Sequence, residues 1–320
     1  MARPLRIEYP GAYYHVTSRG NEQRAIFKDD SDRETFLDIV GRAVEEFSFR
    51  LHGYVLMSNH YHLLVETPKG GLNRALRYVN GVYTQSYNRR HRRVGHLFQG
   101  RYKAILIEKD SYLLELSRYI HLNPWRMKNS PDPFRFLWSS LRAYIGTVNG
   151  PDWLTVEEVL SQFGRPGRKR YREFIREGMK AGVRTPWEEV RGQAVLGSEG
   201  FVDKIAKTLT GKTGGRSGRA SRVGEVMGVT AEGVAREVEE YFGLKRGELK
   251  GRQQRYTEPR YVVSYLLRRH CLLGLREIGV RVGLHYSAVG NAIAQIRDRP
   301  TPSQAKSLRE LERILKNQGT

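Results

Sequence analysis

The stretch "HYHLLVET" at residues 60–67 constrains the fold most, because it combines the pattern of a buried β-strand with a histidine pair. Side chains on a strand alternate between its two faces. Tyr61 and Leu63 therefore face an apolar core, whereas His60 and His62 both point to the other side. Two imidazoles that project side by side from one strand can hold a metal ion. A pair of surface histidines is the simpler interpretation of the pattern taken alone.

The spacing of apolar residues around this strand predicts a mixture of strands and helices. Strands are expected at residues 12–19, 49–57, 60–67 and 101–108, and helices at residues 31–47, 71–90 and 110–123. Only Ser58 and Asn59 separate two of these strands, which predicts a hairpin. A hairpin among strands that alternate with helices predicts an antiparallel sheet with helices packed on it, which is an α+β fold.

The chain carries a large excess of positive charge. Its 320 residues include 55 Lys and Arg against 34 Asp and Glu, which gives a net charge of +21, and roughly half of this excess falls in residues 201–320. An excess that is spread over both halves suits a polyanionic partner, most often nucleic acid. A generally basic protein without such a partner has the same composition, so charge alone does not decide between the two.

The cysteine content and the apolar runs exclude several classes of protein. Cys271 is the only cysteine, so the chain has no intramolecular disulfide. The longest apolar runs are far shorter than the ~20 residues that cross a bilayer. The first residues lack the apolar core of a signal peptide. A cytoplasmic protein without a membrane partner is therefore expected.

The helix predicted at residues 110–123 offers groups that a two-histidine metal site lacks. Tyr119 and Asn123 are four residues apart and therefore lie on one helical face. The amide oxygen of Asn123 can complete a His-His-Asn ligand set, which suits Mg²⁺ or Mn²⁺ better than structural zinc. Tyr119 is then a candidate nucleophile, because a metal can polarise the phosphate that it attacks. A C-terminal helix cap is the simpler interpretation of Asn123, which precedes a proline.

Four ordered stretches carry a resemblance to a known family. They are "YYHVTSRGN" (13–21), "GYVLMSNHYHLLVET" (53–67), "GHLFQGRYKAILIE" (95–108) and "SRYIHLNP" (117–124). These stretches resemble the HUH single-tyrosine transposases, and in particular the branch of REP-associated tyrosine transposases. The resemblance covers roughly residues 1–145 and implies a ferredoxin-like HUH fold.

By position, the resemblance implies that His60 and His62 bind the metal, that Tyr119 is the nucleophile, and that Asn123 is the polar residue one turn beyond it. It implies an enzyme that joins its tyrosine to a 5′ phosphate of single-stranded DNA and leaves a free 3′-hydroxyl. It further implies a DNA hairpin beside the cleavage site and, for many members, a homodimer. Polar residues of the matched stretches are candidate DNA contacts, although a structural role suits them equally well: Arg19, Asn21, Gln99 and Arg101.

The stretch "GLREIGVRVGLHYSAVGNAIAQIRD" at residues 274–298 predicts a helix-turn-helix, and an ordinary helical hairpin is the alternative. Residues 247–298 resemble the C-terminal DNA-binding domain of the bacterial chromosomal replication initiator, which implies binding to duplex DNA. Residues 285–288 read His-Tyr-Ser-Ala where the initiators have Asp-His-Ser/Thr-Thr, so recognition of the initiator's own site is not implied. The candidate contacts in the basic loop and the second helix are Lys250, Arg252, Arg255, His285, Tyr286, Ser287 and Asn291.

The sequence thus predicts an HUH transposase domain at residues 1–145, a connecting region at 146–198 that is broken by Gly and Pro, and an all-α DNA-binding domain at 199–320. A metal-dependent transposase is the leading hypothesis. One alternative is a non-catalytic DNA-binding regulator that keeps the transposase fold. The other is a hydrolytic metallonuclease, which uses the metal but no tyrosine.

Overall fold

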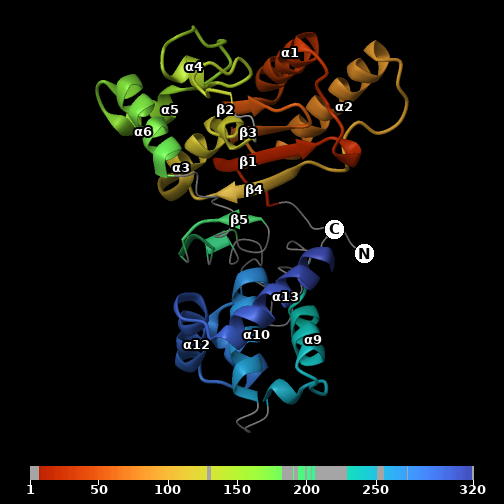
Figure 1. Cartoon of the computed structure of the whole chain (residues 1–320), viewed down its shortest axis with the longest axis vertical. Helices are drawn as coiled ribbons and strands as arrows, with labels where there is room; N and C mark the ends of the chain where they lie inside the picture. Colours follow the sequence, from red (N-terminus) through yellow and green to blue (C-terminus); the bar gives the residue numbers. More distant parts are fainter. Residues whose placement is uncertain are drawn as a thin grey trace. The chain divides into compact units, whose positions relative to one another are not determined.

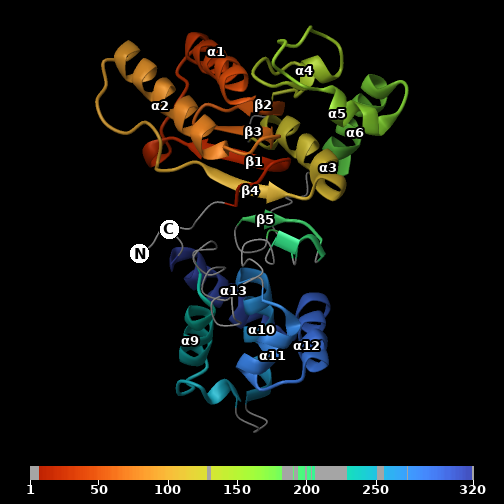
Figure 2. The same cartoon turned by 180° about the vertical axis from the view of Figure 1, so that it is seen from behind.

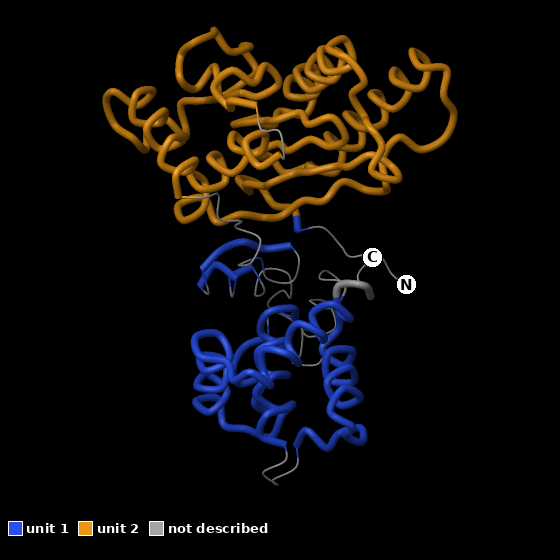
Figure 3. The backbone as a smooth tube through the Cα atoms, viewed as in Figure 1, with its two compact units in different colours: residues 1–7, 190–320 blue, residues 8–189 orange. Residues whose placement is uncertain are grey.

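The structure is a computed structural model, and it describes residues 7–127, 131–181, 190, 194–198, 200–202, 204–205, 229–250, 256–271 and 273–318. The chain divides into two compact units (Figure 3), one of residues 8–189 and the other of residues 1–7 and 190–320. Across the described ranges, no helix is both long enough and apolar enough to cross a membrane.

An antiparallel sheet lies at the centre of the unit formed by residues 8–189 (Figures 1 and 2). Its strands lie in the order β2 (Arg50–Leu56), β3 (His60–Thr67), β1 (Ala12–Arg19) and β4 (Lys103–Ile107). The predicted α+β class and the predicted hairpin of β2 and β3 are confirmed. β1 and β3 are buried along almost their whole length, which requires that both faces of the sheet be covered.

Two helices, α1 (Asp30–Phe47) and α2 (Leu72–Arg90), cover the face of the sheet that carries Tyr61. The ring of Phe36 on α1 lies with its centroid 4.8 Å from that of Tyr61. The Tyr61 hydroxyl donates a hydrogen bond of 2.7 Å to Oδ1 of Asn80 on α2. The alternation in residues 60–67 therefore predicted the core face of this strand correctly.

The opposite face, which carries the histidines, is covered by α3 (Lys109–His121). Leu113, Leu116 and Ile120 of this helix are buried. The helix ends two residues before its predicted end, where Pro124 begins the short 3₁₀ turn η2 (Pro124–Arg126). Proline has no N–H to continue the helical hydrogen bonds, which accounts for this end.

The first unit extends well beyond residue 145. The elements that follow are α4 (Leu141–Tyr144), α5 (Glu157–Leu160), η3 (Ser161–Phe163) and α6 (Gly167–Ala181). A Cβ added to Gly178 of α6 would lie 2.7 Å from Cδ of Arg118, so α6 packs directly against α3. The Gly and Pro residues that suggested a connecting region separate short helices of this same unit.

A buried polar network joins α3 to α4 and α6. His121 is fully buried, with Nδ1 2.6 Å from the Tyr171 hydroxyl and Nε2 2.7 Å from the hydroxyl of Ser140. The Tyr171 hydroxyl in turn donates to Oγ of Ser117 at 3.0 Å. Because His121 and Ser117 flank Tyr119 by two residues on either side, this network fixes the part of α3 that carries the candidate nucleophile.

Tyr171→Phe tests the energetic contribution of this network. The substitution leaves the buried Nδ1 of His121 without its partner, which costs about 1–3 kcal/mol, whereas the Ser117 hydroxyl keeps its hydrogen bond to the Leu114 carbonyl. Urea unfolding measures this loss. Tyr78→Phe is the matched control, since half-buried Tyr78 packs through its ring on Phe47, and we expect it to cost less than about 0.5 kcal/mol. Equal costs for the two variants would contradict the role of the network.

Acid should destabilise this unit partly through His121. Burial lowers the pKa of His121 to about 3, whereas an unfolded histidine titrates near 6.5. Below pH ~6.5 the unfolded chain therefore takes up a proton that the folded chain does not, so stability falls as the pH falls towards 3. His121→Gln should flatten the dependence of the unfolding free energy on pH by up to about 1.4 kcal/mol per pH unit between pH 6 and 4. The comparison needs urea titrations of both proteins, and parallel curves would contradict the prediction.

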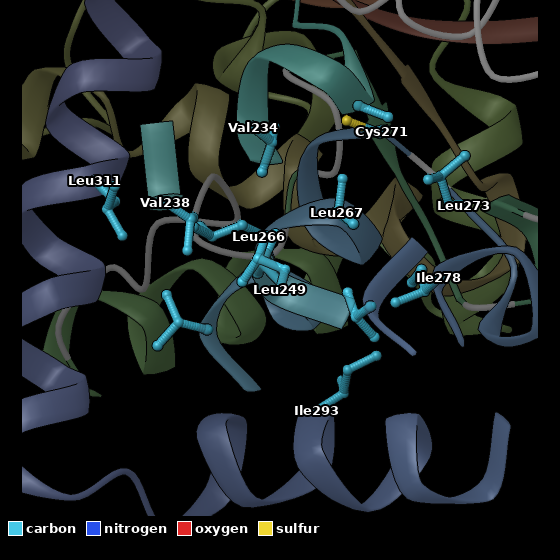
Figure 4. Packing of buried hydrophobic residues seen from close by; sticks show 14 of the residues in the cluster. Val234, Val238, Leu249, Leu266, Leu267, Cys271, Leu273, Ile278, Ile293 and Leu311 are labelled. Carbon is cyan, nitrogen blue, oxygen red and sulfur yellow. The ribbon is translucent and has the colours of Figure 1, made fainter. Parts of the chain in front are cut away.

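The second unit is mainly helical where it is described. Besides the short strand β5 (Val195–Leu196) and the turn η5 (Glu248–Lys250), its elements are α9 (Ala231–Tyr241), α10 (Thr257–Cys271), α11 (Leu275–Val282), α12 (Tyr286–Asp298) and α13 (Pro302–Gln318). Figure 4 shows the core that these helices share, to which Val238, Leu266, Ile278, Ile293 and Leu311 contribute.

The helices α11 and α12 span the segment for which the sequence predicts a helix-turn-helix. Gly283 ends α11 with a φ of 68°, a left-handed conformation that glycine adopts without strain. A Cβ at this position would lie 3.0 Å from the carbonyl oxygen of Lys250, so the turn also lies close to η5. Glycine at this position is therefore required both by the turn and by its neighbour.

Candidate active site

Four of the residues singled out in the sequence lie together on the histidine face of the sheet. The rings of His60 and His62 lie with their centroids 5.0 Å apart. Tyr119 of α3 is 7% exposed, and its ring lies edge-on to that of His62 at 5.8 Å. Nδ2 of Asn123 lies 3.2 Å from Nε2 of His62, and the Asn123 side chain is also hydrogen-bonded to His60. The fold thus brings β3 into contact with Tyr119 and Asn123, which lie about 60 positions later in the chain.

Burial keeps both imidazoles of this cluster neutral. Burial, followed by the positive charge of Arg19, lowers the pKa of His60 to about 4. The pKa of His62 is held well below its usual value, first by burial and then by the neighbouring His15, His60 and Arg126. A neutral imidazole keeps a nitrogen lone pair, which is the form that binds a metal ion.

The residues present fit a divalent metal of the oxygen- and nitrogen-preferring kind. Nδ1 of His60 donates to Oδ1 of Asn59 at 2.7 Å, which leaves the lone pair on Nε2. Asn123 lies beside both imidazoles, and rotation of its amide exchanges the NH₂ for the oxygen. Two imidazoles and one amide oxygen suit Mg²⁺ or Mn²⁺ and leave further positions for water or a phosphate oxygen. In the described parts of the chain, no group of three or more His, Cys, Asp or Glu side chains could hold a metal, so the set depends on the asparagine.

Two residues beside this cluster were missed in the sequence. His15 on β1 lies with Nε2 2.8 Å from Nδ1 of His62, and the two rings are stacked. The guanidinium of Arg126 lies 5.1 Å from the ring centroid of Tyr119. The alternation of side chains along the first strand could have indicated His15, but its pairing with the histidine strand was not known. Arg126 lies two residues after Pro124, outside the predicted helix, so the helical spacing did not indicate it.

The candidate DNA contacts of the first unit are exposed residues near the His60 end of the sheet: Arg19, Asn21, Gln99 and Arg101. Backbone hydrogen bonds hold three of them in place. The Gln99 N–H donates to the Arg19 carbonyl at 2.9 Å, and the Asn21 N–H donates to that of Leu97 at 2.8 Å. Between them, the Gly20 N–H donates to the Asn59 carbonyl, and a Cβ at Gly20 would lie only 2.1 Å from the Arg24 carbonyl oxygen. Glycine therefore allows this polar loop to lie against the histidine strand.

The candidate DNA contacts of the second unit are exposed where they are described: Lys250, His285, Tyr286, Ser287 and Asn291. Arg252 and Arg255 lie outside the described residues. At the start of α12, Nδ1 of His285 lies 2.8 Å from Oγ of Ser287, and its ring lies 4.2 Å from that of Tyr286. The guanidinium of Arg276 lies 5.5 Å from the Tyr286 ring centroid. This end of α12 therefore presents polar and aromatic groups to solvent.

Residues 8–123 match the model of a protein family described as "Transposase IS200 like". Five chains of known structure match this chain, and one of them is described as "Structure of the REP associates tyrosine transposase bound to a REP hairpin". The two sequences are 14% identical, the alignment covers 48% of this chain and 92% of that chain, and the TM-score is 0.41. No curated protein sequence matches this chain. The family match spans the sheet, α1 to α3 and all four residues of the cluster, so residues 8–123 are similar to the IS200-like transposases.

Proposed function

We propose that this protein is a transposase that nicks and rejoins single-stranded DNA through a covalent link to Tyr119. The observation that carries this proposal is the contact of Tyr119 with His62, with Asn123 one turn further along the chain and hydrogen-bonded to the same imidazole. The match of residues 8–123 to the IS200-like transposases supports it. The sequence resemblance to REP-associated transposases adds the substrate class, which is single-stranded DNA with a hairpin beside the cleavage site.

In the proposed reaction, the Tyr119 hydroxyl oxygen attacks the phosphorus of a phosphodiester and gives up its proton to water. The bond from phosphorus to the 3′ oxygen breaks, and that oxygen takes up a proton as a free 3′-hydroxyl. The 5′ phosphate stays attached to Tyr119. Attack by another 3′-hydroxyl on this phosphotyrosine restores a phosphodiester and the tyrosine, so strand joining needs no nucleotide hydrolysis.

Residues around Tyr119 have separate roles in this proposal. His60, His62 and Asn123 would hold Mg²⁺ or Mn²⁺, which supplies charge neutralisation at the scissile phosphate. Arg126 and Arg19 add positive charge beside the cluster and would attract the phosphate. α3 holds Tyr119 in position through the buried network of His121 and Tyr171.

The second unit is proposed to bind duplex DNA through α12. Exposed groups at the start of this helix, including Tyr286 and Ser287, are suited to contact base edges or phosphates in the major groove. A homodimer, implied by the sequence resemblance for many family members, belongs to this proposal as well.

The double variant Tyr286→Ala/Asn291→Ala should weaken duplex binding by at least about 30-fold while single-strand cleavage stays unchanged, because each of the two lost base contacts costs ~1–3 kcal/mol. Fluorescence anisotropy with a duplex at fixed salt measures the affinity. Lys306→Ala on α13 is the control for loss of a surface side chain, and it should bind as the wild type does. Unchanged affinity of the double variant would count against α12 as the DNA-contacting helix.

Cleavage products of a hairpin-containing DNA strand, labelled at either end, test the proposed function. With Mn²⁺, the fragment on the 3′ side of the cut should migrate with the protein on a denaturing gel, and a polymerase should extend the other fragment from its free 3′-hydroxyl. Cleavage with two protein-free fragments would favour a hydrolytic metallonuclease instead. Tight binding without cleavage, across several hairpins, would favour a DNA-binding regulator.

A further inference from the structure

His15 on β1 is a buried titratable group beside the candidate metal ligands, and the proposed reaction does not use it. It is 2% exposed, and its ring is stacked on that of His62 at 5.0 Å with an interplanar angle of 17°. Its edge also meets the Tyr119 ring at 6.1 Å. The pairing of β1 with β3 accounts for this position, because Thr17 lies opposite His62 and His15 opposite Leu64, so His15 and His62 are diagonal neighbours on one face.

The hydrogen bonds around His62 determine which of its nitrogens carries the proton. The Asn123 amide is oriented with Nδ2 3.2 Å from Nε2 of His62, and in this orientation it donates to that nitrogen, so Nε2 holds a lone pair. In a neutral imidazole the proton then resides on Nδ1, and this N–H donates to Nε2 of His15 at 2.8 Å. His15 is therefore the acceptor that stabilises the one tautomer of His62 whose Nε2 can bind a metal.

His60 has an equivalent arrangement with a different acceptor. Its Nδ1–H donates to Oδ1 of Asn59 at 2.7 Å, which likewise leaves the lone pair on Nε2. Metal-binding histidines generally donate their second ring N–H to an acceptor that fixes the ring and its tautomer. In most sites that acceptor is a carboxylate, a carbonyl or water, whereas here a third imidazole takes the role for His62.

We propose that His15 is a positioning residue for the metal site, which holds His62 in the Nδ1-protonated tautomer and fixes the plane of its ring through the stacked contact. This inference rests on the proposed function only in that it takes His62 to be a metal ligand. His15 itself does not touch the metal or the DNA in this role. Loss of its acceptor nitrogen should therefore weaken metal binding while the fold is preserved.

Two substitutions separate the acceptor from the stacking ring. His15→Phe keeps a flat ring against His62 but removes the acceptor, and Mn²⁺ affinity should fall about 10–100-fold. His15→Gln loses the stacking but supplies an amide oxygen as acceptor, and it should recover most of the affinity that His15→Phe loses. Mn²⁺ binding is measured directly by electron paramagnetic resonance of the free ion, without DNA and without reference to cleavage. The melting temperature of each metal-free variant reports its fold.

Nitrogen NMR of the metal-free wild type provides a test that needs no substitution. With ¹⁵N-labelled histidine, His62 should show a protonated Nδ1 and an unprotonated Nε2, and the opposite tautomer would overturn the inference. Equal Mn²⁺ affinity of His15→Phe and the wild type would also overturn it. So would an equal loss of Mn²⁺ affinity in His15→Gln and His15→Phe. If the wild type does not bind Mn²⁺, both the proposed metal site and the role of His15 are overturned. If the wild type binds Mn²⁺ and His15→Phe binds it equally well, only the role of His15 is overturned.

Discussion

Tyr119→Phe should abolish covalent attachment of DNA to the protein and reduce strand cleavage by at least about 10³-fold, since removal of a nucleophile is among the most severe losses an active site can suffer. The substitution removes one hydroxyl, while the ring that packs edge-on to His62 and His15 remains. Mn²⁺ binding and the melting temperature should therefore change little. Labelled hairpin DNA on a denaturing gel measures both the adduct and the cleavage.

Tyr112→Phe is the matched control, because Tyr112 lies on α3 seven residues before Tyr119. This variant should form the adduct as the wild type does. An adduct that persists in Tyr119→Phe would show that another residue is the nucleophile. Cleavage that persists there without an adduct would show that water, and not a tyrosine, attacks the phosphate.

His60→Ala should lower Mn²⁺ affinity by more than about 100-fold and bring cleavage below detection, because it removes one of only two imidazoles from the proposed ligand set. His60 is half-buried at the first position of β3, so the core of the sheet should tolerate its truncation better than that of buried His62. Mn²⁺ titration with and without DNA measures the loss.

His96→Ala provides the control for removal of an imidazole, since His96 is exposed on the segment between α2 and β4. This variant should bind Mn²⁺ and cleave DNA as the wild type does. Addition of EDTA to the wild type should reproduce the loss seen with His60→Ala. Cleavage at the wild-type rate in His60→Ala, or in EDTA, would contradict a metal-dependent reaction.

Local patterns in the sequence predicted the elements of the first 125 residues closely. Alternation in residues 60–67 indicated the strand and its core face, and helical spacing with a following proline indicated α3 to within two residues at its end. These signals are local, because side-chain direction in a strand or helix follows from the backbone alone. The same signals indicated which side His60 and His62 share.

Local sequence patterns did not predict the parts of the site that depend on contacts between distant segments. His15 lies beside His62 only because β1 pairs with β3. The alternation of apolar and polar residues in a strand does not indicate which strand it pairs with. The packing of α6 on α3 is a second example. Tyr171 contacts His121, which lies 50 residues earlier in the chain. The segment that carries Tyr171 is rich in Gly and Pro, and this composition suggested a connecting region. Tertiary contacts of this kind override local composition.

Mass spectrometry of the trapped complex tests the central proposal most directly. After reaction with Mn²⁺ and a hairpin-containing strand, nuclease and trypsin digestion should leave a nucleotide mass on the peptide of residues 119–126, which starts with Tyr119 and follows Arg118. Fragmentation should place that mass on the tyrosine through its phosphate. A nucleotide on any other peptide, or cleaved DNA with no modified peptide, would contradict the account.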